Sequence, residues 1–496
     1  MKKTALCFLL VGFSAFLIAQ SVSLDADFGA NGKIVTGLYG ISGNPYGIDF
    51  ITLPEGEIVV GGSVGDYVGL EKYGNAGALD TTFSTSLLAS DGLEVSLCAQ
   101  KDGKILMVAE NPVGLSTFVA RMDVSGNLDP GFGTGGIAQT NITHFFVRNV
   151  FVQSDGKVIV FGDEWTSNSS FSALRLHSNG RIDSSFAMNG KLSIDLPDYA
   201  YEVPMAMLEQ PDHKLLFVGS IGYPNSNIFM LRINSDGTRD NAFGVDGMVI
   251  DPIQGNSNAY ALTLQPDGKI LVAGNSGPIN QAIVVRYHGD GSLDTYFGNE
   301  GVQYFPELKE CIGIALRPDG KILAANWSSN SMLGNIVLAQ LLPNGQIDLS
   351  FGEEGIFRII DPGMRPRALC LTGNKATVSA RKPTGTTQKR LFRVLLDLNV
   401  GVLDPSKSSD LNLLVYPNPI SEQFTLQFGL TEKAEVSVHL FDLQGKLVQA
   451  LVQNQSFENG EHALSLSCPN HLPAGNYILT LEVEGKKRTS IQIMKK

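Results

Sequence analysis

The sequence predicts an all-β protein in which a seven-bladed β-propeller is followed by a small Ig-like β-sandwich. Three observations lead to this fold class. An Asp-x-x-Phe pattern recurs seven times in 496 residues, tight turns recur at the same interval, and the pattern stops before a C-terminal segment of different composition. The seven copies are Asp25/Phe28, Asp80/Phe83, Asp129/Phe132, Asp183/Phe186, Asp240/Phe243, Asp294/Phe297 and Asp348/Phe351.

The spacing of the copies indicates a repeat architecture. Successive phenylalanines are 55, 49, 54, 57, 54 and 54 residues apart. A fixed period of this size is typical of propellers, solenoids and arrays, in which each unit packs only against its neighbours. No helical periodicity lies between the turns, and a β-helix would need a much shorter coil. Four short strands in each period therefore predict one blade per copy.

The elements of one repeat follow from residues 265–298. An apolar segment ends at Asp267-Gly268, which predicts a hairpin because Gly adopts a positive φ without steric cost. The continuous apolar run that follows, residues 270–274, predicts a strand buried on both faces. The next strand ends in Arg286, a second turn follows, and a last short strand comes after the repeat Phe.

A basic residue precedes the repeat Asp by eight positions in most copies. We expect these pairs to be structural ties within or between blades, since residues repeated in every copy are poor candidates for the unlike roles of an active site. Gln340/Asp348 keeps the spacing but loses the charge. The charged pairs are Lys72/Asp80, Arg121/Asp129, Arg175/Asp183, Arg232/Asp240 and Arg286/Asp294.

The two ends of the repeat region predict how the ring closes. The chain enters inside a unit at Leu24-Asp25. We expect the first strand, near residues 33–36, to complete the blade that contains residues 366–398, which removes an open sheet edge. The predicted organisation is a signal peptide (1–20), the propeller (21–403), a polar linker (404–410) and the sandwich (411–496). The apolar run of the signal, residues 5–18, is too short for a confident membrane span, and no other candidate span is found.

Two family resemblances follow from these motifs. Residues 24–400 resemble the delta-60 repeat, best matched at residues 265–298, with departures at Ser84, Leu87 and Ala187. This resemblance implies a propeller and no established activity. The C-terminal segment looks like the type A sorting domain of the type IX secretion system of Bacteroidetes, on the residues Tyr416, Pro417, Asn418, Pro419, Gly445, Lys446, Gly475 and Tyr477.

The second resemblance implies a location and partners. The protein is expected to be exported and then passed across the outer membrane by the type IX machinery and its sortase, to the cell surface or the medium. The formal net charge of −12 opposes nucleic-acid binding, which would need a local basic patch, and we expect none. The cysteines left after signal removal suggest no disulfide framework: Cys98, Cys311, Cys370 and Cys468.

The sequence predicts no catalytic, cofactor-binding or metal-ligating residue. Residues 131–136 fit G-x-G-x-x-G and residues 61–65 fit G-x-S-x-G, but both motifs require a strand-to-helix turn that an all-β repeat lacks. Residues 234–240 and 288–294 carry alternating oxygen ligands. Turn chemistry is the preferred interpretation there, and calcium stays open as the alternative. Trp165 and Trp327 are expected in loops, where an exposed ring stacks on sugars.

The predicted function is therefore a non-enzymatic binding or scaffold module that meets an extracellular glycan or protein through its loop faces. The alternative is an extracellular hydrolase or lyase with a site at the propeller axis, and a spacer without a specific ligand is a third option. An enzyme would gather unlike acids, bases or His at one end of the axis, whereas a binder would present aromatic or polar patches.

Overall fold

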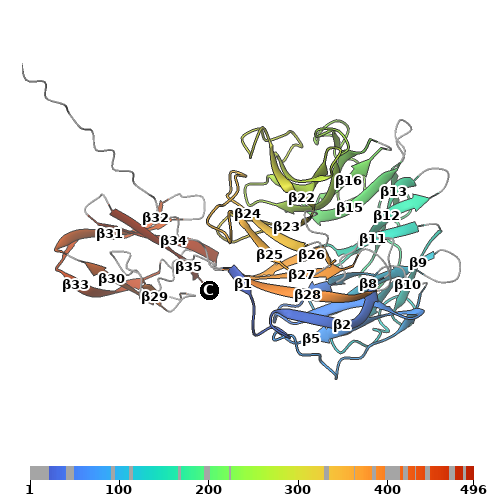
Figure 1. Ribbon diagram of the computed structural model, residues 1–496, viewed down its shortest axis with the longest axis horizontal. Coiled ribbons are helices and arrows are strands. Elements are labelled where there is room, and N and C mark those ends of the chain that lie inside the picture. Colours follow the sequence, from blue (N-terminus) through green and yellow to red (C-terminus); the bar gives the residue numbers. More distant parts are fainter. Residues whose placement is uncertain are drawn as a thin grey trace, which may run out of the picture. The chain divides into compact units, whose positions relative to one another are not determined.

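The computed structural model divides the chain into two compact units, Met1–Asp397 and Leu398–Lys496. The elements are β-strands throughout the described part (Figure 1). Among the described residues, no helix is long and apolar enough to cross a membrane. The structure describes residues 22–40, 50–90, 95–110, 116–143, 145–165, 169–194, 201–222, 225–328, 335–361, 363–382, 387–396, 414–416, 420, 423–430, 432–441, 447–468, 475–483 and 487–495.

The first unit consists of seven blades of four antiparallel strands each, as predicted. Blades V and VI share the long strand β22, which pairs with β21 through its first half and with β23 through its second. In chain order the blades are I, β3 (Phe50–Thr52), β4 (Ile58–Val64), β5 (Tyr67–Tyr73) and β6 (Leu88–Ala89); II, β7 (Ser96–Ala99), β8 (Ile105–Glu110), β9 (Ser116–Met122) and β10 (Ile137–Thr143); III, β11 (Phe145–Val152), β12 (Val158–Trp165), β13 (Ser169–Leu176) and β14 (Lys191–Ile194); IV, β15 (Glu202–Glu209), β16 (Leu215–Ile221), β17 (Asn227–Ile233) and β18 (Met248–Asp251); V, β19 (Asn258–Leu264), β20 (Ile270–Ser276), β21 (Gln281–Tyr287) and the start of β22 (Val302–Leu316); VI, the end of β22, β23 (Ile322–Ser328), β24 (Asn335–Leu341) and β25 (Ile356–Ile359); and VII, β26 (Arg365–Thr372), β27 (Lys375–Arg381), β28 (Thr387–Leu396) and β2 (Lys33–Gly40).

Blade VII is built from both ends of the propeller sequence. Strand β2 pairs with β28, with Lys33 opposite Phe392. The short strand β1 (Val22–Leu24) also pairs with β28, with Val22 opposite Leu396. The N-terminal segment therefore supplies the outer strand and the repeat Asp and Phe of the last blade, which confirms the predicted closure.

The first strands of the blades form the inner ring. Each packs against the first strands of both neighbouring blades, and β26 packs against β3 to close the circle. Strands alternate in direction, so the hairpin between the first and second strands and the turn between the third and fourth lie at one end of the ring. We call this end the hairpin face. The connections from the second to the third strand and from blade to blade lie at the other end, the loop face.

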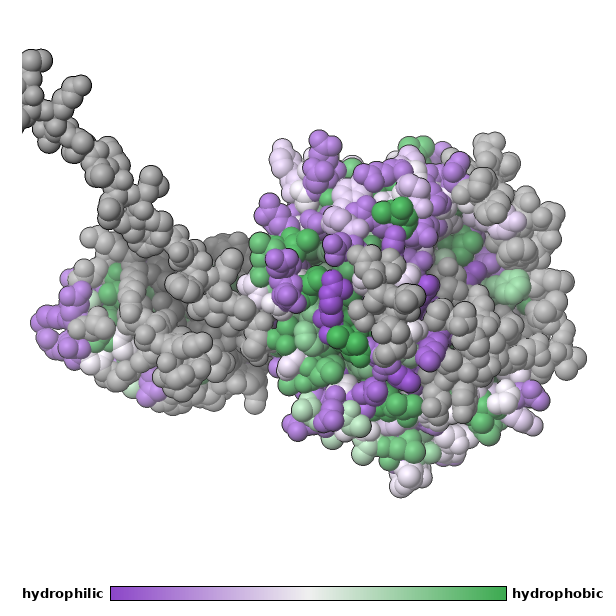
Figure 2. Space-filling model, viewed as in Figure 1, coloured by the Kyte–Doolittle hydropathy of each residue, from purple (hydrophilic) through white to green (hydrophobic). Residues whose placement is uncertain are grey.

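Apolar side chains fill the space between neighbouring blades. Every residue of β16 and of β20 is buried, as their unbroken apolar sequences predict. One hydrophobic cluster lies at each of the seven blade interfaces. The described surface in Figure 2 intersperses hydrophilic and hydrophobic residues, which is ordinary for a folded protein.

The second unit is a sandwich of two sheets. The first contains β29 (Leu414–Tyr416), β30 (Gln423–Leu430) and β33 (Gly460–Ser467), and the second orders β32 (Leu447–Phe457), β31 (Ala434–Phe441), β34 (Gly475–Val483) and β35 (Lys487–Lys495). Side chains of both sheets share one core.

The sorting-domain motif is only partly described. Tyr416 ends β29, Gly475 begins β34, and the Tyr477 side chain is buried in the core of the sandwich. Pro417, Asn418, Pro419, Gly445 and Lys446 lie outside the described residues, as do the expected signal peptide (1–20) and linker (404–410).

Candidate functional site

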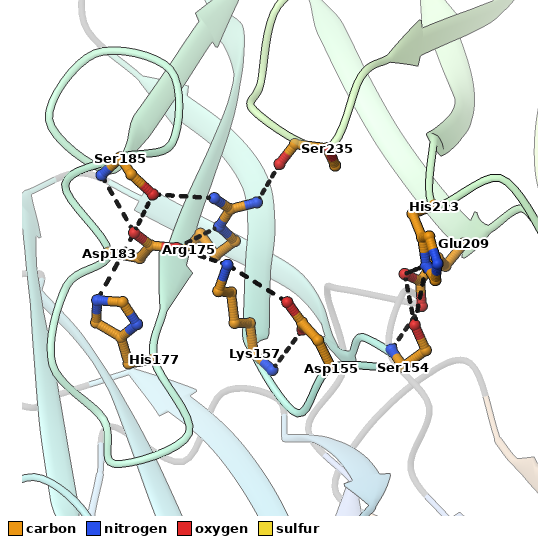
Figure 3. A network of polar contacts seen from close by, with 10 residues as sticks. All are labelled: Ser154, Asp155, Lys157, Arg175, His177, Asp183, Ser185, Glu209, His213 and Ser235. Atoms are coloured by element: carbon orange, nitrogen blue, oxygen red, sulfur yellow. Dashed lines mark hydrogen bonds and ion pairs between the residues drawn. The ribbon is translucent and has the colours of Figure 1, made fainter.

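The repeated residues build one polar contact on the hairpin face, shown for blade III in Figure 3. The Asp183 carboxylate accepts a hydrogen bond from Arg175 Nε at 2.8 Å and lies 3.4 Å from Lys157 Nζ. Burial opposes ionisation of this carboxyl, but hydrogen bonds from Ser185 and the charges of Arg175 and Lys157 outweigh it and hold the pKa of Asp183 well below its usual range. The group is therefore a permanent anion inside a structural contact.

The same Arg reaches the next blade. Arg175 Nη1 donates to the carbonyl of Ser235 in blade IV, while its guanidinium lies 4.4 Å from the ring centre of Phe186. We call this set of contacts the latch. The ties predicted from the Arg/Asp spacing therefore act both within and between blades. The equivalent interblade bonds run from Arg121 to Ser178, Arg232 to Gly289, Arg286 to Pro343 and Arg393 to Asn75.

The repeat Phe and the turn Gly complete the latch. Phe297 is fully buried, and a Cβ on Gly345 of the next blade would come within 2.7 Å of its ring and of the Gly298 nitrogen. Only a glycine lets the two backbones approach this closely. The other repeat phenylalanines are buried as well: Phe28, Phe83, Phe132, Phe186, Phe243 and Phe351.

In blade VI the residue types at two positions are swapped relative to blades II to V. Gln340 stands where the other blades have a basic residue, and it donates from Nε2 to Asp348 at 2.8 Å. The fully buried Arg317 stands at the end of the first strand, a position that is Gln in blades II to V, and its Nη1 donates to Gln340 Oε1. The guanidinium missing from one strand is thus supplied by another.

The turns that suggested calcium use their carboxylates internally. Asp236 Oδ1 accepts from the backbone and side chain of Thr238 at 2.9 and 2.6 Å, and Asp290 does the same with Ser292 at 2.9 and 2.7 Å. This is turn chemistry. Among the described residues, no group of three or more His, Cys, Asp or Glu gathers in a way that could hold a metal ion. The two glycine motifs fall on the turn of blade II and on strand β4.

One cluster on the hairpin face departs from the repeat. Glu209, at the end of β15, accepts bonds from the backbone nitrogen and the hydroxyl of Ser154 in blade III, at 2.6 and 3.0 Å (Figure 3). It also lies 3.1 Å from Nδ1 of His213. His213 has a φ of 63° at a hairpin position that is Gly in five other copies, so it holds a conformation unfavourable for a side chain.

This Ser, His and Glu do not form a catalytic triad. Ser154 Oγ and Glu209 Oε1 both lie 3.1 Å from the same imidazole nitrogen, Nδ1 of His213. In a triad the base presents one nitrogen to the nucleophile and the other to the acid. Since Ser154 and Glu209 come from adjacent blades, the cluster ties blade III to blade IV.

The copies differ most on the loop face. In the second strand of each blade, five mainly apolar residues follow the hairpin, and a sixth residue comes after them. The type of this sixth residue differs between neighbouring blades. We call these residues, with their partners on the first strands, the rim. From blade I to blade VII the position holds Ser63, Glu110, Asp163, Ser220, Asn275, Trp327 and Arg381.

A bulge in the inner strand supplies the partner of a rim residue. In β11 the register shifts around Arg148, whose Nε lies 2.5 Å from Asp163 Oδ1. In β19 it shifts around Tyr260, whose hydroxyl accepts from Asn275 Nδ2 at 3.1 Å. Bulges re-aim side chains and often lie next to binding sites. Blades III and V thus carry different polar pairs at the loop-face end of the ring, where Asp163 and Asn275 are buried and Tyr260 is half-buried.

The two tryptophans lie in strands, so the expectation of loop positions is wrong. Trp165 ends β12 and Trp327 lies within β23, because each blade extends its second strand beyond the apolar run. Trp327 Nε1 donates to Glu310 at 3.1 Å, and the Arg365 guanidinium covers the ring at 3.9 Å from its centre. One face of this half-buried ring is therefore unavailable to a sugar.

Two family models match the chain. A domain of unknown function described as a β-propeller, DUF5122, matches residues 153–186, 210–243, 265–297 and 317–351. A secretion system C-terminal sorting domain matches residues 414–496. Both sequence resemblances are confirmed. None of the curated proteins matches this sequence.

Solved structures of similar fold are distant in sequence. The polysaccharide lyase Uly1 is 9% identical, with a TM-score of 0.42 over 76% of this chain and 99% of its own. A protein from Lactobacillus plantarum is 13% identical, with a TM-score of 0.42 over 82% and 99%. Hydrazine synthase from Kuenenia stuttgartiensis is 13% identical, with a TM-score of 0.41 over 72% and 96%. Similarities this distant carry no argument about function.

Proposed function

Because the chain carries DUF5122 β-propeller repeats and ends in a type IX secretion sorting domain, it is secreted to the cell surface or the medium, and we propose that its propeller is a non-catalytic binding module. The ligand is an extracellular glycan or protein, and it meets the rim on the loop face. The sorting domain serves delivery, with the secretion machinery and its sortase as partners.

The divergence of the rim is the observation that carries this proposal. On the hairpin face, Arg, Asp, Lys and Phe recur because each blade needs the same contact with the next. On the loop face, the corresponding strand ends hold Ser, Glu, Asp, Asn, Trp and Arg at one structural position. Recognition of an asymmetric ligand needs unlike groups at one end of the ring, and the rim has them.

Two of the three rim acids, Asp163 and Glu310, have described side chains, and their state favours binding over catalysis. Asp163 is held by Arg148, and Glu310 accepts the Trp327 indole N–H. Both carboxylates are occupied as acceptors. The described histidines of the propeller, His177, His213 and His288, all belong to turns of the hairpin face, so none of them stands beside the rim acids as a general base.

A binding screen of the mature secreted chain tests the proposal. The protein is tested against immobilised glycans and isolated envelope proteins, with and without calcium. The rim variant Tyr260→Ala/Asn275→Ala is expected to lose affinity by about tenfold, the loss of one well-formed polar contact. The matched control, Asp267→Asn on an exposed hairpin of the same blade, is expected to bind like the wild type.

Two results would overturn the proposal. Equal affinities of the rim variant and the wild type would place the ligand elsewhere on the molecule. Release of new reducing ends or new peptide termini from a retained ligand would favour the hydrolase or lyase alternative, since a binding module leaves its ligand intact.

A further inference from the structure

Positive charge is concentrated in blade VII. Residues 361–393 contain eight Lys and Arg and a single acid, Asp361, although the whole chain has 37 basic and 49 acidic residues. The expectation that no local basic patch exists is therefore wrong, and a count of charge along the sequence finds it. The eight cations are Arg365, Arg367, Lys375, Arg381, Lys382, Lys389, Arg390 and Arg393.

Six of these cations share one end of the blade. They lie at the start of β26, at or directly after the end of β27, and near the start of β28, which are adjacent strands that meet at the loop face. Lys375 and Arg393 lie at the opposite, hairpin end. We call the six the basic cluster: Arg365, Arg367, Arg381, Lys382, Lys389 and Arg390.

The cluster has an inner and an outer part. Lys389 is buried and donates from Nζ to the Gly61 carbonyl at 2.8 Å, and Arg390 pairs with Asp361, which also lies 3.4 Å from Lys33. Arg365 and Arg367 are half-buried, and Lys382 is exposed. Arg381 is buried as well. The three inner cations, Arg381, Lys389 and Arg390, thus have roles in the fold, while Arg365, Arg367 and Lys382 border the solvent.

Arg365 is held in a fixed orientation. Its guanidinium carbon lies over the Trp327 ring, 3.9 Å from the ring centre, and the indole is anchored by its hydrogen bond to Glu310. Stacking occupies the face of a guanidinium and leaves its N–H edge for an oxyanion. A preorganised Arg loses less conformational entropy on binding a carboxylate or sulfate.

The register places like charges side by side. Arg365 and Arg381 are direct partners across the β26–β27 ladder, and Arg367 occupies the bulge two residues on. Like charges at opposed positions destabilise a sheet. Because Arg381 is buried and has a contact of its own within the fold, the charges that can meet an anionic ligand are those of the outer cations.

We propose that the basic cluster binds the carboxylate or sulfate groups of an acidic polysaccharide. This inference rests on the proposed binding function and names its ligand class. A sugar chain presents anionic groups singly, on separate residues, and the cluster is confined to one blade. A nucleic acid would need a positive groove that follows a continuous backbone and free aromatic rings for stacking, whereas Arg365 covers one face of the half-buried Trp327 ring.

The test measures binding of the mature secreted chain to four probes: polygalacturonate, dextran sulfate, neutral dextran and a single-stranded DNA oligonucleotide. The wild type is expected to bind one or both acidic polysaccharides, with affinity that falls as salt rises. Arg365→Gln/Arg367→Gln is expected to bind at least about tenfold more weakly. Lys375→Gln, which removes one charge from the hairpin end of the same blade, is expected to bind like the wild type.

A surface variant keeps the test valid if the double variant folds poorly. Lys382→Gln changes an exposed side chain and is expected to reduce affinity by about threefold, as the loss of one partly screened charge should. Wild-type affinity in both variants would overturn the inference, and so would tighter binding of DNA than of either polysaccharide. Binding to neutral dextran that depends on the rim, but not on these cations, would overturn the inference and leave the proposed function standing.

Discussion

At the hairpin face, blades II to V hold the same Arg, Asp, Lys and Phe, whereas at the loop face neighbouring second strands never end in the same residue. The two faces are formed by opposite ends of the same strands. Sequence repetition therefore marks the contacts that every blade needs, whereas positions without such a contact vary from blade to blade.

The repeat Phe should be the most sensitive position of the latch. Phe297 is fully buried between blades V and VI, under the Arg286 guanidinium at 4.5 Å from its ring centre. Phe297→Ala is expected to lower the free energy of unfolding by roughly 3–5 kcal/mol, through lost burial and the cavity left behind. Denaturant unfolding measures it. A loss below about 1 kcal/mol would mean that the hairpin face does not hold the blades together.

The exchange in blade VI offers a sharper test, because both partners are known. Arg317→Gln removes the donor to Gln340, and Gln340→Arg places a second guanidinium beside Arg317, so each single change is expected to cost about 2 kcal/mol. The double variant recreates the Gln and Arg arrangement of blades II to V and should return to within about 1 kcal/mol of the wild type. Additive losses in unfolding free energy would show that the two positions are independent.

The pH dependence of stability tests the latch carboxylates. Burial opposes ionisation of Asp348, but hydrogen bonds from Lys321, Ser350 and Gln340 outweigh it and lower the pKa of Asp348 to about 2. A pKa below the unfolded value means that this stabilisation is complete above about pH 5 and is lost as the pH falls towards 2.

The matching variant is Asp348→Asn. Over that pH range the wild type is expected to lose about 2 kcal/mol more than Asp348→Asn, because a pKa shift of one unit corresponds to about 1.4 kcal/mol. Unfolding curves at several pH values measure the difference. If the free energy of unfolding depends on pH in the same way for both proteins, the ionised Asp348 does not stabilise the fold.

Residue type and spacing were sufficient to predict the blade count, the closing strand and the Arg/Asp ties. Lys33 pairs with Phe392 because the closed ring leaves no open sheet edge between its first and last blades. The sequence indicates this closure, since the chain enters the repeat in the middle of a unit. The loss of charge at Gln340 was visible too. Its compensation by Arg317 was not, because the two residues lie on non-adjacent strands of the blade and only folding brings them together.

The candidate site was much less predictable. The pairing of Arg148 with Asp163 depends on a bulge in β11, and sequence alternation cannot locate a bulge that shifts the register by one residue. The end of the apolar run predicts a loop at Trp327, yet the strand continues through it. The basic cluster forms no run of charge in a short window, because its cations are spread over three strands, and only a count over residues 361–393 shows the excess.

The smallest expected effect separates the two ends with a pair of lysines. Lys269, on the hairpin of blade V, lies 3.1 Å from the buried Asp294 carboxylate, whereas Lys382 is exposed on the loop face of blade VII. Lys269→Gln is expected to cost up to about 1 kcal/mol, the upper value for a partly exposed ion pair. Lys382→Gln is expected to change stability by less than about 0.5 kcal/mol.

The order of these two values carries the argument, since both substitutions remove one charge from one lysine. A greater loss at Lys269 in denaturant unfolding would mean that even the partly exposed charges of the hairpin face stabilise the fold, and that the loop-face charges are held for another purpose. A greater loss at Lys382 would reverse the assignment: the basic cluster would then be part of the fold, and the divergence of the loop face would reflect local packing in each blade.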